Sequence, residues 1–446
     1  MRKYIKFALP GIIFLAIVLR FISLNQSLWL DEATTALVAR MPIADIFTKF
    51  LPGDFHPPFY YLLMKGWVLL FGASEISLRM PSVILGVLTI YFVYLIAKKL
   101  SSKRTALIAS ILLATSGLAI YYSQEARMYS LAAALVTLSV YLFVEKKWTL
   151  FGITLALIGL TDYVALSIIP VFIILSLKDI KKMFLSLVPL LVAFAFWAPT
   201  FVRQLGGGVA QRGTAWWSLL GTTTFKNILL IPTKFIFGRI GFDNRVFYGA
   251  ITLLAFSLFV FLLFKAKKAS KTIWFWLISP IIIGILVGLI IPTLSYFRFL
   301  FCLPAFYILI AEGIENVGKA KYILLSLVIA INVLSSGYYL TNPKFQREDW
   351  RGIAQVVGED TIVYPANSQK EALVYYQLGN QIVNFTDFVG GPQTIWLSRY
   401  VWDIFDPTDA ARIKVESLGY NKVSELNLNG VEFWQYSRVV QYARGN

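Results

Sequence analysis

Two adjacent carboxylates, Asp31 and Glu32, follow the first long apolar stretch of the chain. An acid pair at this place is open to three interpretations. It can be part of a solvated loop, a charged first turn that the helix dipole favours, or half of an active site that faces a lipid-borne substrate. The last interpretation has a definite chemistry, because a carboxylate within hydrogen-bond reach of a hydroxyl can take its proton during attack on a substrate.

A pair of opposite charges, Glu125 and Arg127, lies two residues apart between two other apolar stretches. Ionisable residues so close to a bilayer are costly unless they are paired or serve a function. A structural ion pair that snorkels to water explains them as well as a binding site does. Arg298 is open to the same choice, because an interfacial arginine anchors a helix and a guanidinium also binds anions.

Other polar residues stand between the remaining apolar stretches. Lys234 and Arg239 lie in an amphipathic segment, where they fit anchors of a helix on the membrane surface. His56 precedes two prolines, where it fits a turn. The full set of candidate substrate contacts is His56, Tyr122, Glu125, Arg127, Tyr129, Asp162, Lys234, Tyr296 and Arg298.

The composition is that of a polytopic membrane protein. Of 446 residues, 58% are hydrophobic and only 15% are charged, far from the average of a soluble chain. The formal charge of +17 comes from short clusters of lysine and arginine between apolar stretches, as the positive-inside rule expects of cytoplasmic loops, so we expect no nucleic-acid partner. One cysteine, Cys302, and one histidine exclude a disulfide framework and a multi-histidine metal centre.

The basic start of the chain predicts a cytoplasmic N-terminus, so the first helix delivers the acid pair to the outer face. The apolar segment that opens at His56 and ends near Gly72 decides the topology that follows. This segment is about 16 residues long with Lys65 in its middle, short for a hydrocarbon core of about 30 Å. If it crossed, three later basic clusters would face outward. We therefore expect it to lie in the interface, together with a surface helix at residues 42–47.

Eleven transmembrane helices are predicted, which places the C-terminal tail outside the cell membrane. The pair that flanks Thr161–Tyr163 is short and should leave a recess at the outer surface. A longer external loop includes an open stretch at residues 206–212 and the aromatic pair Trp216–Trp217. The predicted spans are Phe7–Leu24, Pro81–Ala97, Thr105–Tyr121, Met128–Val144, Thr149–Leu160, Val164–Leu177, Met183–Val202, Val246–Phe264, Thr272–Ile291, Phe299–Glu312 and Tyr322–Leu340.

From residue 341 the composition becomes polar and mixed, so the chain divides into a membrane domain, 1–340, and a soluble extracytoplasmic domain, 341–446. Strands that alternate with helices predict a small α/β domain, with a role as a lid or in recruiting the acceptor. The predicted strands are 361–364, 381–385 and 394–398, and the predicted helices are 350–357, 369–378 and 407–418.

Three blocks carry a resemblance to a known family. They are Trp29-Leu30-Asp31-Glu32, then His56-Pro57-Pro58 with Tyr60-Tyr61, then Tyr122-Ser123-Gln124-Glu125-Ala126-Arg127-Met128-Tyr129, in that order and spacing. Together they resemble the glycosyltransferase-C superfamily, and within it the protein O-mannosyltransferase and aminoarabinose-transferase-like membrane enzymes. The blocks cover about the first third of the chain, and later spans match in layout and in Tyr296 and Arg298 only.

The resemblance implies an enzyme of the glycosyltransferase-C fold in the plasma membrane. It would transfer a sugar, with inversion, from a polyprenyl or dolichyl monophosphate donor to an acceptor hydroxyl on the extracytoplasmic face. It makes Asp31, with Glu32 beside it, the base or a metal-binding acid. Arginine offers paired donors to the leaving lipid phosphate, which suits Arg127 and Arg298, with His56 and Lys234 as weaker candidates. Glu125 would hold Arg127 or bind sugar hydroxyls.

One departure from the family pattern is Asp162, which stands where many relatives carry a histidine before the tyrosine. It is open to a sugar contact or, with Asp31, to an oxygen-ligand site for Mg²⁺ or Mn²⁺. The sequence leaves the acceptor open between protein, lipid and glycan. Two alternatives stay open: a flippase or transporter for lipid-linked sugars, against which the absence of internal repeats counts, and a ligase of the same superfamily that acts on a lipid-linked glycan.

Overall fold

A computed structural model describes residues 5–210, 212–214, 217, 220–366 and 368–438. The chain forms two compact units. The helical unit has its limits in the sequence at Met1–Leu24, Met41–Gly72 and Ile76–Phe345. The mixed unit has its limits at Asn25–Arg40, Ala73–Glu75 and Gln346–Asn446, so the segment with Asp31 and Glu32 groups with the C-terminal part of the chain.

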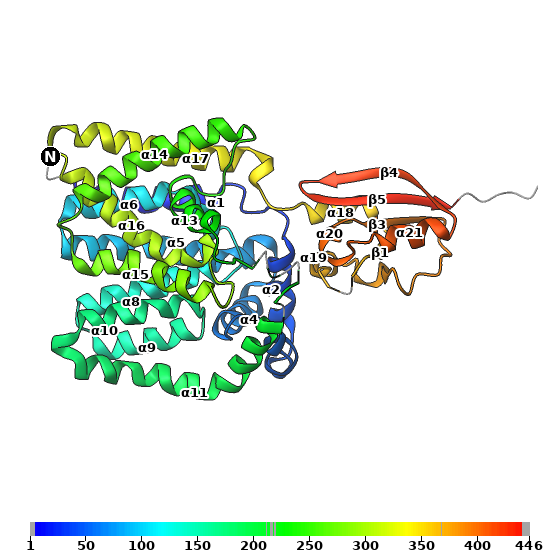
Figure 1. Ribbon diagram of the computed structural model, residues 1–446, viewed down its shortest axis with the longest axis horizontal. Coiled ribbons are helices and arrows are strands. Elements are labelled where there is room, and N and C mark those ends of the chain that lie inside the picture. Colours follow the sequence, from blue (N-terminus) through cyan, green and yellow to red (C-terminus); the bar gives the residue numbers. More distant parts are fainter. Residues whose placement is uncertain (1–4, 211, 215–216, 218–219, 367, 439–446) are drawn as a thin grey trace, which may run out of the picture. The chain divides into compact units, whose positions relative to one another are not determined.

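The helical unit is built from the apolar stretches, which form helices because every backbone polar group must be bonded within the segment when no water is near. Most of its helices run side by side (Figure 1). Its first half contains α1 (Ile5–Phe21), α3 (Ile43–Asp45), η1 (Ile46–Phe50), η2 (Leu51–Gly53), α4 (Phe59–Phe71), α5 (Glu75–Leu100), α6 (Lys103–Thr115), α7 (Gly117–Ser123), α8 (Tyr129–Val144) and α9 (Trp148–Gly159). Its second half contains η3 (Val164–Ile168), α10 (Ile169–Leu175), η4 (Leu177–Asp179), α11 (Ile180–Ala210), α13 (Phe225–Phe237), α14 (Arg245–Lys265), α15 (Lys271–Gly288), η5 (Tyr296–Cys302), α16 (Leu303–Glu315), η6 (Gly318–Ala320), α17 (Lys321–Thr341) and η7 (Pro343–Phe345).

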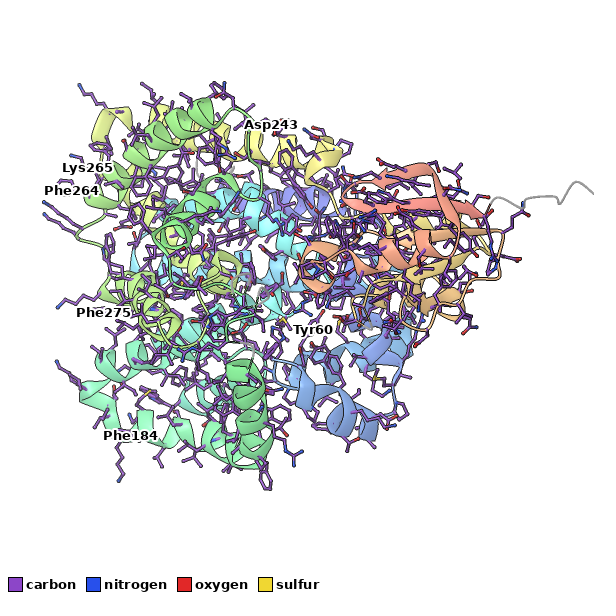
Figure 2. The ribbon with its side chains drawn as sticks, turned by 45° about the vertical axis from the view of Figure 1, so that its right-hand side comes forward. Tyr60, Phe184, Asp243, Phe264, Lys265 and Phe275 are labelled. Atoms are coloured by element: carbon purple, nitrogen blue, oxygen red, sulfur yellow. The ribbon has the colours of Figure 1, made fainter. Side chains whose placement is uncertain are left out.

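Among the described residues, six helices are long and apolar enough to cross a membrane, and a seventh span results if α6 and α7, bent by 61°, are one. Each of the eleven predicted spans falls on helical residues, but α1, α8, α9 and the η3–α10 pair are shorter than 18 residues. The count of eleven therefore stays a prediction. Large apolar side chains such as Phe184 and Phe264 point outward (Figure 2) and are 56% and 61% exposed, as expected of surfaces that meet lipid.

The prediction of an open loop at residues 206–212 is wrong. Helix α11 continues to Ala210, and its three glycines keep helical geometry. Gly208 lies beside the ring of Phe55, in the loop between η2 and α4. Trp216 and the basic residues 1–4 lie outside the described residues, whereas the predicted surface helix at 42–47 is present as α3 and η1.

The mixed unit contains a five-stranded sheet in the order β2-β1-β3-β5-β4 (Figure 1). Strand β1 pairs in parallel with β2 and β3, whereas β5 pairs antiparallel with β3 and β4. The register sets Ile362 opposite Trp396 and Trp396 opposite Gln435. The elements are α2 (Leu30–Arg40), α18 (Trp350–Val357), β1 (Thr361–Tyr364), α19 (Glu371–Tyr375), η8 (Gly379–Gln381), β2 (Ile382–Asn384), β3 (Thr394–Ser398), α20 (Trp402–Phe405), α21 (Ala410–Ser417), β4 (Tyr420–Leu428) and β5 (Val431–Arg438).

The predicted strands and helices of this unit are present, but the β4–β5 hairpin was not predicted. Its turn is Asn429–Gly430, and both residues have a positive φ, of 48° and 93°. An Asn-Gly pair is the strongest short-range hairpin signal, so the sequence contained the information. The hairpin completes the core, since Tyr420 and Tyr436 pack with Leu397 of β3.

Candidate functional site

Asp54, which the sequence analysis did not single out, lies at the centre of a polar cluster in the helical unit. Its carboxylate accepts a hydrogen bond from the hydroxyl of Tyr61 at 2.7 Å and lies 3.4 Å from Nδ1 of His56. Burial raises the pKa of Asp54, but the charge and hydrogen bond of His56, the charge of Arg127 and the bond from Tyr61 outweigh it and lower that pKa to about 2. Asp54 is therefore a firmly ionised carboxylate near the guanidinium of Arg127.

The loop that carries Asp54 and His56 is held by α11. Gln204 is buried, and its Nε2 donates to the carbonyl oxygens of Leu51 at 2.7 Å and His56 at 3.2 Å. Its Oε1 accepts from the hydroxyl of Tyr163 at 2.6 Å, and that hydroxyl accepts from Nε1 of Trp197 at 2.6 Å. Three side chains from two elements thus fix this loop, and the apolar context makes each bond costly to lose.

The turn between α7 and α8 holds Glu125 and Arg127, which are 2% and 6% exposed. It is tied down on both sides, because Oγ of Ser82 donates to the carbonyl of Glu125 at 2.6 Å and Oγ of Ser130 donates to the carbonyl of Tyr122 at 2.8 Å. The two buried ionisable side chains of this constrained turn are kept in one arrangement. Arg127 is also close enough to Asp54 for its positive charge to lower the pKa of that carboxylate.

Arg239 joins a cluster of tyrosines. Its guanidinium lies 4.6 Å from the ring centre of Tyr121, bonds to the hydroxyl of Tyr122 and interacts electrostatically with Tyr296 and Glu125. The expectation that Arg239 anchors a surface helix stays a prediction.

A glycine explains how Arg239 reaches this place. Gly238 ends α13 with a φ of +64°, and a Cβ there would lie 2.9 Å from the carbonyl carbon of Gly117 at the start of α7. Only a residue without a side chain lets the chain turn this close to α7 and direct Arg239 at the tyrosines.

Lys234 stands one turn earlier, on α13. Its Nζ donates to the carbonyl of Ile240 at 3.0 Å. Burial and the neighbouring charge of Arg239 lower the pKa of Lys234 to about 8. Lys234 and Arg239 are two neighbouring like charges, and an anion close to both would relieve their mutual repulsion.

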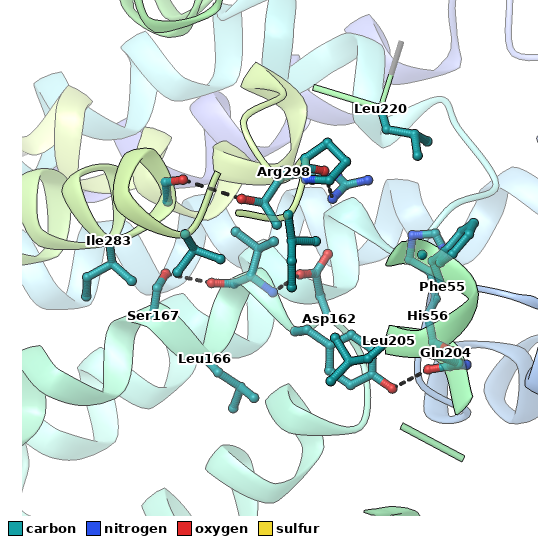
Figure 3. A pocket seen from close by; sticks show the side chains of 18 of the residues that line it. Phe55, His56, Asp162, Leu166, Ser167, Gln204, Leu205, Leu220, Ile283 and Arg298 are labelled. Atoms are coloured by element: carbon teal, nitrogen blue, oxygen red, sulfur yellow. Dashed lines mark hydrogen bonds between the residues drawn. The ribbon is translucent and has the colours of Figure 1, made fainter. Parts of the chain in front are cut away.

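An apolar cavity of about 430 Å³ opens beside these clusters in the helical unit. Figure 3 shows His56 beside Phe55 on the right of the view, Arg298 and Asp162 nearer its centre, and Leu166 and Ile283 toward the left. Nη1 of Arg298 donates to the carbonyl of Pro292 at 3.3 Å, which uses one of its five donors. The cavity therefore combines a largely apolar wall, made by η3, α10, α11 and α15, with a cationic group.

Asp162, a candidate sugar contact or metal ligand, has a structural task in this cavity wall. Its Oδ1 accepts from the backbone nitrogens of Val164 at 2.7 Å and Ala165 at 3.2 Å, so it caps η3. Within the described parts of the chain, no group of three or more His, Cys, Asp or Glu side chains is arranged to hold a metal ion. The predicted Mg²⁺ or Mn²⁺ at Asp31 and Asp162 stays a prediction.

Asp31 and Glu32 form the first turn of α2 in the mixed unit, where Glu32 is buried and Asp31 partly so. Acids of the C-terminal part lie near them. Burial and the charge of Asp31 both raise the pKa of Glu348 and Glu371. The carboxylate of Glu348 is also fixed, since it accepts from Nε1 of Trp350 at 2.8 Å and from the hydroxyl of Tyr400 at 3.0 Å.

The structure thus groups the predicted residues of the helical unit into neighbouring clusters. The rings of Tyr122 and Tyr129 contact each other, with centres 5.4 Å apart, and Phe297 contacts both Tyr129 and Tyr296. The meeting of Asp31 with Glu125 and Arg127 stays a prediction. The sequence analysis did not single out Asp54, although an acid two residues before His56 was a visible signal, and it named Arg239 only as a helix anchor.

The sequence of this chain is similar to those of known proteins. Residues 55–202 match the family of dolichyl-phosphate-mannose-protein mannosyltransferases. An uncharacterised protein of Aquifex aeolicus (strain VF5) is 26% identical over 335 residues, which are 70% of this chain. The chain spans 63% of the length of that relative.

Two solved structures have the same fold. ArnT from Cupriavidus metallidurans bound to undecaprenyl phosphate matches with a TM-score of 0.58 and 13% identity, over 100% of this chain and 99% of that one. The archaeal oligosaccharyltransferase AglB from Archaeoglobus fulgidus, in complex with an inhibitory peptide and a dolichol-phosphate, matches with a TM-score of 0.54 and 14% identity, over 97% of this chain and 74% of that one. The resemblance to the glycosyltransferase-C superfamily is confirmed. Among the described residues, several helices are long and apolar enough to cross a membrane.

Proposed function

We propose that this protein is an inverting glycosyltransferase that moves a sugar from a polyprenyl monophosphate to an acceptor hydroxyl on the extracytoplasmic face of the plasma membrane. The observation that carries the proposal is the cavity of about 430 Å³, whose wall is apolar and which also holds Arg298 and His56. Such a combination suits a ligand with a long hydrocarbon tail and an anionic head. Undecaprenyl phosphate in the ArnT structure and dolichol-phosphate in the AglB structure belong to this class of ligand.

In this proposal the isoprenoid occupies the cavity and its phosphate faces Arg298. The buried guanidinium of Arg127 and the Arg239–Lys234 pair supply further positive charge near the same region of the helical unit. These charges have a catalytic use, because the phosphate gains negative charge when the bond to the sugar breaks. Tyr122, Tyr129 and Tyr296 would bind the sugar through their hydroxyls and ring faces, and Glu125 would orient Arg127 or bind sugar hydroxyls.

The chemical step needs a base as well as a stabilised leaving group. The acceptor oxygen attacks the anomeric carbon, the bond from that carbon to the phosphate oxygen breaks, and the acceptor proton passes to the carboxylate of Asp31. Attack from the face opposite the phosphate inverts the configuration. The proposal therefore requires that Asp31 reaches the donor that the helical unit binds, with Glu32 supporting the first turn of α2.

The test is transfer by the purified protein from a panel of radiolabelled polyprenyl-phosphate sugars to protein, lipid and glycan acceptors. We expect one donor to react, and the variant Arg298→Met to raise the donor KM at least about 10-fold, because a charge-assisted hydrogen bond contributes 1.5–3 kcal/mol. Arg203→Met is the matched control, since Arg203 is exposed on α11 and does not line the cavity. No transfer from any donor would refute the function, and an unchanged KM for Arg298→Met would refute the phosphate site.

A further inference from the structure

The residues just before α2 are bonded to the C-terminal part of the mixed unit. The backbone nitrogen of Arg351 donates to Oγ of Ser27 at 3.0 Å, and Nη2 of Arg351 donates to the carbonyl of Asn25 at 3.0 Å. The backbone nitrogen of Leu28 donates to the hydroxyl of Tyr376 at 2.9 Å. Residues 25–28 are thus fixed by two residues that stand more than 300 positions later in the chain.

The hydroxyl of Tyr376 is the centre of this network. Besides the bond from Leu28, it accepts from Oγ of Ser27 at 3.3 Å and donates to Oε1 of Glu75 at 3.1 Å. Burial raises the pKa of Tyr376 to about 12, so the hydroxyl keeps the proton that it donates. Nη1 of Arg351 approaches the same carboxylate oxygen of Glu75 at 3.4 Å. Each of these side chains makes more than one bond, which limits their freedom to rotate.

The bonded segment ends three residues before Asp31. Helix α2 begins at Leu30, and Ala33 already bonds back to the carbonyl of Trp29 at 3.0 Å, so little free backbone separates the network from the acid pair. Helix α2 also packs along α19, the helix that immediately precedes Tyr376 (Figure 1). A helix held both at its N-terminal entry and along one side has a defined rotation about its own axis, which sets the direction of Asp31.

We infer that Tyr376 and Arg351 of the C-terminal domain are positioning residues for Asp31, so that this domain holds the acid pair in its working orientation. The inference rests on the proposed function, in which Asp31 takes the acceptor proton. Neither side chain contacts the reacting atoms in this account. They act through residues 25–28, and their loss would leave the donor site of the helical unit with its full set of residues.

The experiment compares Tyr376→Phe with Tyr420→Phe in the full-length protein. Both variants remove one hydroxyl from the mixed unit, but the hydroxyl of Tyr420 donates to the carbonyl of Pro392 at 2.6 Å and bonds within the C-terminal part. Arg351→Gln is a second variant of the network, and its partly exposed side chain makes misfolding less of a concern. The readouts are amide hydrogen exchange of residues 28–35 and steady-state turnover with the reactive donor.

For Tyr376→Phe and Arg351→Gln we expect faster exchange in residues 28–35, a kcat reduced about 10- to 100-fold and an unchanged donor KM, because misplacement of a catalytic group affects the chemical step. Tyr420→Phe should match the wild type in both readouts. Unchanged exchange in the two network variants would refute the network, whether or not the protein transfers a sugar. Faster exchange with full kcat would refute the positioning role. A wild type without transfer activity would overturn the proposed function, and with it the role of Asp31.

Discussion

The two units of this protein shift the pKa of their buried carboxylates in opposite directions. In the helical unit, Asp54 stands among His56, Tyr61 and Arg127, and these partners lower its pKa to about 2. In the mixed unit, Glu348 and Glu371 are partly buried and share their surroundings with Asp31, and burial together with that like charge raises their pKa. The same functional group is thus a fixed anion in one unit and a proton-accepting group in the other.

This difference indicates that the carboxylates of the two units have different roles. A carboxylate whose pKa is low is a poor base, because it gains little from taking a proton, but it orients cationic side chains well. The helical unit, with Arg127, Arg239, Arg298 and Lys234, is equipped to bind an anion and hold it. The mixed unit places Glu348 and Glu371 near Asp31, and burial together with the charge of Asp31 raises the pKa of these two glutamates.

The largest predicted effect separates the two kinds of acid. Asp31→Asn should lower kcat about 10²- to 10⁴-fold, the usual contribution of a general base, without changing the thermal stability. Asp54→Asn should lower kcat by about 10-fold or less, since it orients rather than reacts. Turnover with the reactive donor and a melting curve for each variant provide the check. A loss of kcat for Asp54→Asn as large as for Asp31→Asn would reverse the assignment of the base.

The second prediction concerns the pH dependence of anion binding. Lys234 has a pKa of about 8, so it is cationic below that pH and loses its charge as the pH rises through it. We expect the affinity for undecaprenyl phosphate to fall about 10-fold between pH 7 and pH 9.5, as one charge-assisted bond is lost. Lys234→Arg, which stays charged, should bind equally at both values in a calorimetric titration. An identical decline in the arginine variant would remove Lys234 from the anion site.

The smallest predicted effects are two changes of folding stability with pH, which have opposite signs. The pKa of Asp54 falls on folding from 3.8 to about 2, so its stabilisation of about 2 kcal/mol is complete above pH 4 and disappears as the pH drops toward 2. The pKa of Glu348 rises on folding, so protonation stabilises the mixed unit as the pH falls from 7 toward its unfolded value of 4.5.

Melting curves in detergent at several pH values measure both slopes. Asp54→Asn should flatten the slope below pH 4, and Glu348→Gln should flatten the slope between pH 7 and pH 4.5. If both acids changed stability in the same direction over their ranges, the contrast between the two units would be wrong.

The sequence by itself determined the local structure of this protein. The apolar stretches predicted helices at every proposed span, and periodicity predicted α18, β1 and β3 with the bounds that the structure gives them. These features follow from the chemistry of neighbouring residues, which the sequence displays directly. The β4–β5 hairpin belongs to the same class, because its Asn429–Gly430 turn is a local signal that was readable.

Only the tertiary structure decided which of the polar residues act together. Besides His56, the charge of Arg127 lowers the pKa of Asp54, Arg239 reaches the tyrosines because Gly238 approaches Gly117, and residues 25–28 are held by Tyr376. Each of these pairings joins residues that are tens to hundreds of positions apart. The energies that decide them depend on distance and burial in space, and neither quantity is a property of spacing along the chain.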